Sequence, residues 1–336
     1  MQKIDIFNHI WPTKYYEKVQ QVAPHLKDMG NRVKSVPMIS DLDTRFRVMD
    51  TFGQDYRQVL SLSSPPLEVL GGPEDAYELA KIGNDEMAEL CQKYPVRFPG
   101  FIASLPMNNP EGYMAETCRA IDDLGAYGVQ IYTNCAGRPM DEPEFFNLYA
   151  LMAQYDKPIW IHPTRLPTVA DYPTEDWSQY EIWWTLGWPY ETAVCMARLV
   201  FSKLFDKYPN IKIITHHGGG IIPQLEGRVG PGWDQLGSRT SKHKTLLAEL
   251  NHRPIDYFKM FYADSALFGA ASGTRCALDF FGIDKFLFAS DSPFDPEKGP
   301  MYIRETIKII DNLDISNEDR EKIYFKNAEK LFGVTF

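Results

Sequence analysis

The sequence predicts an α/β fold and, within that class, a TIM-type (β/α)8 barrel with an insertion after its first strand and an aromatic cap segment. Eight short apolar segments, typical of buried strands, alternate with helical segments along the 336 residues. This order is expected of parallel strands joined by helical crossovers. Polar residues stand at the ends of several strands, where such a barrel carries its chemistry. No GxGxxG follows the first strand, which disfavours an open doubly wound sheet.

The strand predictions rest on short runs of β-branched and aromatic residues that are bounded by proline, glycine or polar residues. QVLSLSS, for example, is closed by two prolines, and PIWIH ends in a histidine. The predicted strands are residues 4–10, 58–64, 98–105, 128–133, 158–162, 212–217, 260–264 and 286–291.

The helix predictions follow amphipathic spacing and capping residues, such as Asp41 before the helix at 42–52. The predicted helices are 15–22, 42–52, 75–93, 110–124, 143–155, 190–208, 300–313 and 317–331, with a mixed polar and helical stretch at 223–253. Residues 13–40 are predicted to be the insertion, and the Trp- and Tyr-rich residues 166–188 a loop and cap over the site. The sequence has no linker, internal repeat or low-complexity tract, so we expect one domain over residues 1–336.

Composition narrows the classes of partner and compartment. The formal net charge is −10 and no basic run is present, so nucleic acid and anionic membranes are not expected partners. The five cysteines are widely spaced and contain no CxxC, which favours reduced thiols in a cytoplasmic protein. The N-terminus enters a strand directly, without a signal-peptide layout, and no apolar run has the length of a membrane span.

The most informative motif is KIITHHGGG at residues 212–220. A short apolar strand ends in two histidines, and the three glycines after them let the backbone pass close to whatever the histidines face. Either histidine alone could be a hydrogen-bonded core residue. The pattern recurs, however, because other predicted strands also end in a residue that can bind metal.

Four such residues stand at strand ends: His9, His162, His217 and Asp291. Each has a structural alternative, since a histidine can be satisfied by a backbone carbonyl and Asp291 can cap a helix. Barrel closure would bring the four together. Imidazole and carboxylate groups suit one divalent metal ion, typically zinc, with manganese or iron as alternatives.

With these residues in place, the chain resembles the amidohydrolase superfamily, in the branch of aminocarboxymuconate-semialdehyde decarboxylase and related nonoxidative decarboxylases. The resemblance covers nearly the whole chain. It is carried by IDIFNHIWP (4–12), DTRFRVMD (43–50), SLSSPP (61–66), HP (162–163), PYET (189–192), HGGG (217–220), GR (227–228) and SDSP (290–293), in the family's order.

The resemblance implies roles for individual residues. Metal ligands would be His9, His162 and Asp291, and His217 would be the acid/base beside the metal. The family's first strand carries a His-x-His pair, and the first member of that pair is replaced here by Phe7, which cannot bind metal. At most three protein ligands then remain, a number that still holds catalytic zinc elsewhere. His216 is an extra residue and is expected to point away from the site, because neighbours on a strand face opposite sides.

Two arginines are candidates for binding a substrate carboxylate, which a guanidinium fork suits. In the related decarboxylases, an arginine at the position of Arg228 reaches into the neighbouring subunit, which implies a homodimer with shared sites. Arg32, in the insertion, is a second candidate. A surface ion pair is the alternative for Arg228. Four tryptophans of the cap could form an aromatic wall or ordinary packing: Trp177, Trp183, Trp184 and Trp188.

We therefore expect a metal-dependent carbon–carbon lyase that acts on a small aromatic or unsaturated carboxylic acid, with His217 and Asp291 as catalytic residues. Two alternatives stay open. One is a hydrolase, hydratase or oxygenase that uses the same site. The other is a catalytically impaired subunit, marked by Phe7, that assembles with an active paralogue as a heteromer.

Overall fold

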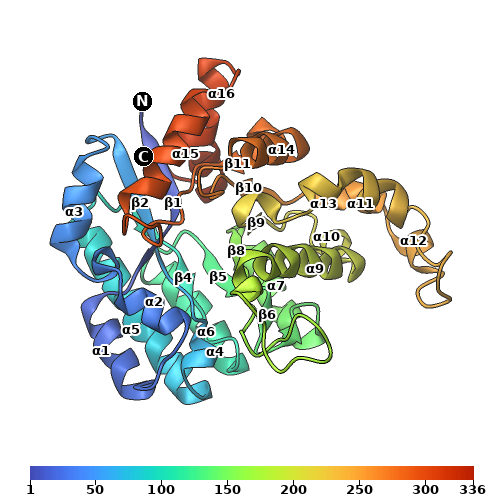
Figure 1. Cartoon of the computed structure of the whole chain (residues 1–336), viewed down its shortest axis with the longest axis horizontal. Coiled ribbons are helices and arrows are strands. Elements are labelled where there is room, and N and C mark those ends of the chain that lie inside the picture. Colours follow the sequence, from blue (N-terminus) through green and yellow to red (C-terminus); the bar gives the residue numbers. More distant parts are fainter.

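The computed structural model describes residues 1–336 and shows a closed barrel of parallel strands surrounded by helices (Figure 1). Two sheets, in the orders β1-β2-β3 and β11-β10-β9-β8-β5-β4, are continuous because β3 and β4 are two halves of one strand. The barrel closes where Ile6 N donates to Phe288 O at 3.0 Å and Asp291 N donates to Phe7 O at 3.0 Å. The predicted barrel is thus confirmed. Its strands are β1 (Lys3–Ile10), β2 (Tyr56–Leu62), β3 (Gly100–Phe101), β4 (Ala103–Ser104), β5 (Val129–Tyr132), β8 (Ile159–His162), β9 (Ile213–Thr215), β10 (Tyr262–Asp264) and β11 (Phe286–Leu287).

The helices lie outside the strands and most agree with the predicted ranges. The segment predicted as 190–208 is two helices, because Lys203 takes a left-handed conformation. The long helices are α1 (Thr13–Val22), α3 (Leu42–Asp50), α5 (Pro73–Lys93), α6 (Pro110–Asp122), α7 (Phe146–Tyr155), α9 (Gly187–Phe201), α14 (Ala271–Phe281) and α15 (Pro300–Asp311). The short ones include α2 (Met29–Lys34), α4 (Leu67–Leu70), α8 (Ile182–Thr185), α10 (Leu204–Lys207), α13 (Pro254–Phe258), α16 (Asn317–Glu321) and α17 (Asn327–Phe332).

Two differences from the sequence-based expectation have physical causes. The last strand is shorter than predicted because side chains replace its ladder: Ala289 N donates to Ser265 Oγ and Ser290 N donates to Asp5 Oδ1. Helix α14 was missed because its first turn contains Gly273 and other small residues of modest helix propensity. Packing of its buried face, including Leu278 and Phe281, holds it in place.

The barrel interior is filled by apolar side chains. A separate cluster of 13 buried apolar residues fills the interior, including Ile4, Ile6, Trp160, Ile214 and Leu287. A larger cluster of 62 residues fills the layer between strands and helices. Because the interior is packed, only the carboxyl ends of the strands remain for a site.

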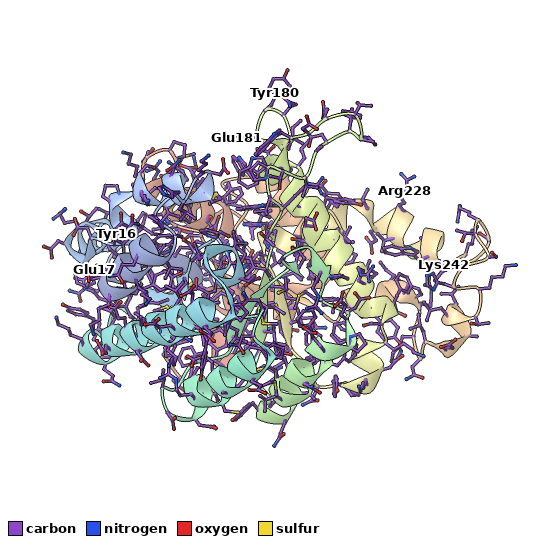
Figure 2. The ribbon with its side chains drawn as sticks, turned by 90° about the horizontal axis from the view of Figure 1, so that it is seen from below. Tyr16, Glu17, Tyr180, Glu181, Arg228 and Lys242 are labelled. Atoms are coloured by element: carbon purple, nitrogen blue, oxygen red, sulfur yellow. The ribbon has the colours of Figure 1, made fainter.

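One segment departs from the compact body. Helices α11 (Glu226–Trp233) and α12 (Leu246–Glu249), with the loop between them, form an arm that projects sideways (Figures 1 and 2). Most residues from 234 to 250 are exposed. None of the helices in the structure combines the length and the apolar character needed to cross a membrane.

Candidate metal centre

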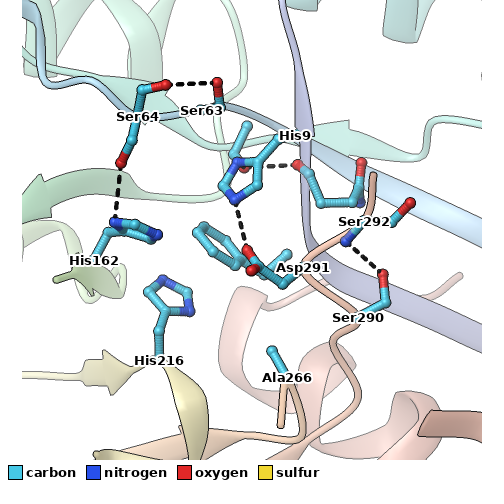
Figure 3. A network of polar contacts seen from close by, with 12 residues as sticks. His9, Ser63, Ser64, His162, His216, Ala266, Ser290, Asp291 and Ser292 are labelled. Atoms are coloured by element: carbon cyan, nitrogen blue, oxygen red, sulfur yellow. Dashed lines mark hydrogen bonds and ion pairs between the residues drawn. The ribbon is translucent and has the colours of Figure 1, made fainter. Parts of the chain in front are cut away.

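Three of the predicted ligands meet at the carboxyl ends of the strands (Figure 3). His9 lies on β1, His162 ends β8 and Asp291 follows β11, and their ligand atoms all lie within 4.8 Å of one another. The three residues are 1%, 2% and 5% exposed. His9 Nε2 is 2.8 Å from Asp291 Oδ1, so two ligand atoms already face each other.

Serine hydroxyl groups orient both imidazole rings. Ser61 Oγ donates its proton to Asn8 O at 2.8 Å and lies 3.4 Å from His9 Nδ1. Ser61 Oγ can therefore accept Nδ1–H of His9, and in that tautomer Nε2 carries the lone pair that binds a metal. Ser64 Oγ stands 3.4 Å from His162 Nδ1 in the same way. This is the outer hydrogen bonding that metal-binding histidines require.

His217 is adjacent to the three ligands but outside the group. Its Nε2 is 3.6 Å from Asp291 Oδ2, an ion-pair contact slightly longer than a hydrogen bond. His217 has a φ of +55° and Asp291 a φ of +61°. Left-handed conformations of non-glycine residues are uncommon and gather at functional sites. The adjacent glycines are needed, since a Cβ on Gly220 would lie 2.5 Å from Pro189 O.

Burial and charge set the protonation of these groups. Burial raises the pKa of Asp291, but the close imidazoles of His217 and His9 outweigh burial, so its pKa lies well below the usual range. Burial and neighbouring histidines lower the pKa of His162. For His217, burial lowers the pKa, but Asp291 and Asp264 outweigh burial and raise it above its ordinary value. The lowered pKa values favour ionised Asp291 and neutral His162, as metal binding demands, while the raised pKa of His217 favours its protonated form.

The donor set fits a divalent metal ion. Two neutral imidazoles and one carboxylate converge from three strands, and this mixture suits zinc, manganese or iron. The buried Nε2 atoms of His216 and His217 have no hydrogen-bond partner. Buried polar nitrogens without a partner are costly, so they indicate a site built for a bound group.

His216 does not point away from the site, so the expectation from strand alternation is wrong. Strand β9 ends at Thr215, and alternation no longer applies beyond it. The His216 ring stacks on Phe7 with centroids 3.5 Å apart and lies 5.7 Å from the His162 ring. Its Nδ1 donates to Asp264 Oδ2. Phe7 also lies inside the barrel, 4.5 Å from the His9 ring.

A buried polar network beneath the centre was missed by sequence reasoning. Arg45 is fully buried and donates to Asn8 Oδ1, Gln58 Oε1 and the carbonyl of His9. Burial lowers the pKa of Arg45 to about 10. Asp5 accepts from Tyr56 Oη at 2.6 Å and from the backbone and hydroxyl of Ser290. The signal was present, since Asp5 is a charged residue between two buried isoleucines, Ile4 and Ile6, and a buried charge needs partners.

A cavity of about 250 Å³ opens onto the three ligands. Six of its fourteen lining residues are Trp, Phe or Tyr, and three of the four predicted tryptophans are among them. Trp177 is not, and it is 54% exposed on the cap. The lining residues are His9, Asp28, Met29, Arg32, Ser64, His162, Glu181, Trp183, Trp184, Trp188, Phe268, Asp291, Phe294 and Tyr302.

The two candidate arginines differ in position. Arg32, on α2, lines the cavity, and its Nη2 donates to the carbonyls of Phe294 and Asp295. It forms no salt bridge within the chain, so its charge is available. Arg228 is exposed on α11 and lines a separate groove of about 530 Å³, outside the cavity of its own chain. Figure 2 shows its side chain pointing away from the body.

Comparison with known proteins agrees with this architecture. The family model described as "Amidohydrolase" matches residues 4–334. Gamma-resorcylate decarboxylase of Polaromonas sp. is 33% identical, with 87% of each chain covered. The 2-amino-3-carboxymuconate-6-semialdehyde decarboxylase of Dictyostelium discoideum is 29% identical, covering 88% of this chain and 77% of its own.

A solved structure extends the comparison to the metal. A dihydroxybenzoic acid decarboxylase from Polaromonas sp., with bound manganese and the inhibitor 2-nitroresorcinol, is 28% identical. It superimposes with a TM-score of 0.77, covering 99% of this chain and 97% of that one. The relatives are thus decarboxylases of aromatic or unsaturated carboxylic acids, and a divalent metal is bound in one of them. By its sequence and its barrel, this chain belongs to the amidohydrolase family.

Proposed function

We propose that this protein is a metal-dependent nonoxidative carboxy-lyase that acts on a small hydroxylated aromatic acid. The observation that carries the proposal is the single cavity in which the three ligands, the aromatic wall and the unpaired Arg32 meet. The decarboxylase relatives support the same reaction class. We further propose that His9, His162 and Asp291 hold the metal.

The reaction needs a proton donor beside the bond that breaks. When bound, the metal would supply a Lewis acid for the substrate carboxylate and a neighbouring oxygen. Loss of carbon dioxide leaves the electron pair of the broken carbon–carbon bond on the ring carbon. His217 delivers its proton to that carbon, and its raised pKa keeps the proton available near neutral pH. Asp291 faces His217 and stabilises the imidazolium form.

The cavity limits the size and shape of the substrate. Its volume of about 250 Å³ lies just below the range of typical ligand pockets, roughly 300–1,000 Å³. Flat walls from Trp183, Trp188 and Phe268 suit one planar ring. Arg32 then offers free guanidinium donors to a carboxylate or phenolate oxygen. We propose hydroxybenzoates such as 2,6-dihydroxybenzoate as the first class to test.

The same proposal includes the identity of the metal and the cellular compartment. Zinc was expected from the ligand types, but the related structure holds manganese, so both metals should be tested. All five cysteines are free thiols, which supports the cytoplasm as the compartment.

We also propose a homodimer in which Arg228 completes the cavity of the neighbouring subunit. Arg228 is exposed on the arm and has no acidic partner within its own chain. The surface of the cap and helix α9 nearby exposes large apolar side chains, including Tyr172, Tyr180, Leu186 and Tyr190. An exposed apolar surface of this kind favours a protein partner.

Carbon dioxide release tests the reaction. The protein is loaded with Mn²⁺ or Zn²⁺ and incubated with a panel of hydroxybenzoates, 5-carboxyvanillate and their decarboxylated products. We expect stoichiometric carbon dioxide and arene from at least one acid, and a loss of roughly 10²–10⁴-fold in kcat for His217→Ala with metal content unchanged. Hydrolysis of amide or lactone substrates without any decarboxylation would contradict the proposal.

Mixing two variants of reduced activity tests the shared site. Arg228→Ala and His217→Ala are unfolded and refolded together, so that half of the dimers are hybrids. Each hybrid has one cavity with an intact His217 and an intact Arg228 from its neighbour, so roughly a quarter of the wild-type activity should return. No recovery in hybrids that are demonstrably formed would contradict the shared site.

A further inference from the structure

The proposed reaction assigns no step to His216, which forms a buried pair with Asp264. His216 follows β9 and Asp264 ends β10, and both side chains are 0% exposed. Nδ1–H of His216 donates to Asp264 Oδ2, and the other oxygen of Asp264 accepts from Ala266 N at 3.2 Å. The carboxylate therefore fixes both the tautomer and the orientation of the imidazole.

The atom of His216 that lacks a partner is Nε2, on the opposite edge of the imidazole ring. Because Nδ1 holds the proton, Nε2 has a free lone pair, yet it is buried without any hydrogen-bond partner. A phenyl ring covers one face of the imidazole, at 3.5 Å from Phe7, and offers nothing to that lone pair. A buried acceptor left unpaired costs about 1–3 kcal/mol, so the position is favourable only if Nε2 binds a cation or a donor.

The position of the ring favours a cation. His216 lies beside His162, one of the three metal-ligand candidates, and Figure 3 shows its ring directed toward that group. A carboxylate that receives Nδ1–H while Nε2 stays free is the outer arrangement of a metal-binding histidine. The three ligands alone leave a divalent metal at least one position short of tetrahedral coordination.

We propose that His216, oriented by Asp264, is a fourth protein ligand of the metal and supplies the imidazole that the first strand lacks because residue 7 is phenylalanine. The proposal rests on the metal centre of the proposed function. His216 stands outside the group whose ligand atoms lie within 4.8 Å, so its ring must move toward the metal. Stacking on Phe7 involves no directional bond, which allows the imidazole to slide along the phenyl face.

Cobalt binding tests this ligand without using catalysis. Co²⁺ is added to the metal-free full chain, and both its affinity, by competition with a chelator, and its visible absorption spectrum are measured. For His216→Ala we expect a loss of affinity larger than the roughly 10–100-fold that removal of an outer hydrogen bond costs, and an altered spectrum. Asp264→Asn should weaken binding within that 10–100-fold range. The exposed His25 provides the control, His25→Ala, which should match the wild type.

A residue exchange guards against simple misfolding. The double variant Phe7→His with His216→Ala places an imidazole on β1 and removes the imidazole that follows β9. We expect it to recover most of the affinity that His216→Ala loses. Thermal unfolding of each metal-free variant shows whether the barrel is intact before metal is added.

The outcomes separate this inference from the proposed function. If His216→Ala folds and binds Co²⁺ with the affinity and spectrum of the wild type, His216 is not a ligand, while the decarboxylase proposal stands. If the double variant folds but binds Co²⁺ no more tightly than His216→Ala, the inference that His216 replaces the missing imidazole of position 7 is wrong. If the wild type binds no divalent metal, both proposals fail. Absence of carbon dioxide release with normal metal binding would overturn only the decarboxylase.

Discussion

The barrel mouth, where His9, His162 and Asp291 meet, and the projecting arm differ in how they hold their polar side chains. At the mouth, the three ligand candidates are at most 5% exposed, and each contacts another polar residue of the same chain. On the arm, Arg228 is exposed and contributes to a cavity only if another molecule approaches. Side chains that are fixed by contacts within the chain are suited to catalysis, whereas exposed side chains without such contacts are available to bind a partner.

The largest effect expected from this contrast is on metal content. His162→Ala or Asp291→Ala removes one ligand of the preformed group, so we expect elemental analysis to find no stoichiometric metal in either variant. Arg228→Ala, which changes only the arm, should retain the wild-type content. If both variants of the barrel mouth retained their metal, the buried residues of the mouth would not be what holds it.

The next effect is on stability. Arg45→Met removes a buried cation from beneath the mouth and leaves its three acceptors unpaired, which should lower the free energy of unfolding by about 3–5 kcal/mol. The matched change on the arm side is Arg253→Met, which breaks an exposed pair with Asp234 and should leave stability nearly unchanged. Urea unfolding of the metal-free proteins measures both. Equal losses would show that the arm is held as firmly as the mouth.

A smaller effect is expected from Arg228→Ala on turnover. Loss of a charged hydrogen bond to the substrate should reduce kcat/KM by roughly 10- to 100-fold. Arg228→Lys should recover only part of it, since an ammonium lacks the guanidinium fork. Steady-state kinetics at constant metal content measures this change, and wild-type kinetics in the alanine variant would confine all function to the mouth.

The smallest effect concerns pH. Burial raises the pKa of Asp5 to about 6, although hydrogen bonds from Ser290 and Tyr56 oppose the rise, while the ordinary value of 3.8 applies in the unfolded chain. Between these values the folded state binds more protons than the unfolded state, so the contribution of Asp5 to stability increases as pH falls through about 6.

We therefore expect the stability difference between the wild type and Asp5→Asn, measured in the metal-free proteins, to shift in favour of the wild type from pH 7 to pH 5. Other titrating groups cancel in this difference. A difference that is independent of pH would show that Asp5 is ionised throughout the range.

Much of the mouth could be predicted from the sequence because its residues follow a local pattern. His9, His162 and Asp291 each stand at the end of an apolar run, and barrel closure brings such ends together. The barrel itself followed from alternating strands and helices, and the comparisons confirm both the fold and the family.

The features that the sequence did not predict depend on contacts between distant segments. The direction of His216 depends on where β9 ends and on Asp264, which is 48 positions away. The role of Arg45 depends on its hydrogen bonds to carbonyl and amide groups of β1 and β2. No periodic pattern in the sequence indicates these contacts. Helix α14 was missed because tertiary packing overrides weak helix propensity.

Metal-dependent decarboxylation is tested most directly by titrating metal-free protein with Mn²⁺ while carbon dioxide release from 2,6-dihydroxybenzoate, or from the best acid of the panel, is measured. We expect activity to rise with bound metal and to saturate at one ion per chain, because each barrel mouth holds one set of ligand candidates. Saturating metal binding without carbon dioxide from any acid of the panel, or release that does not depend on metal, would contradict this expectation.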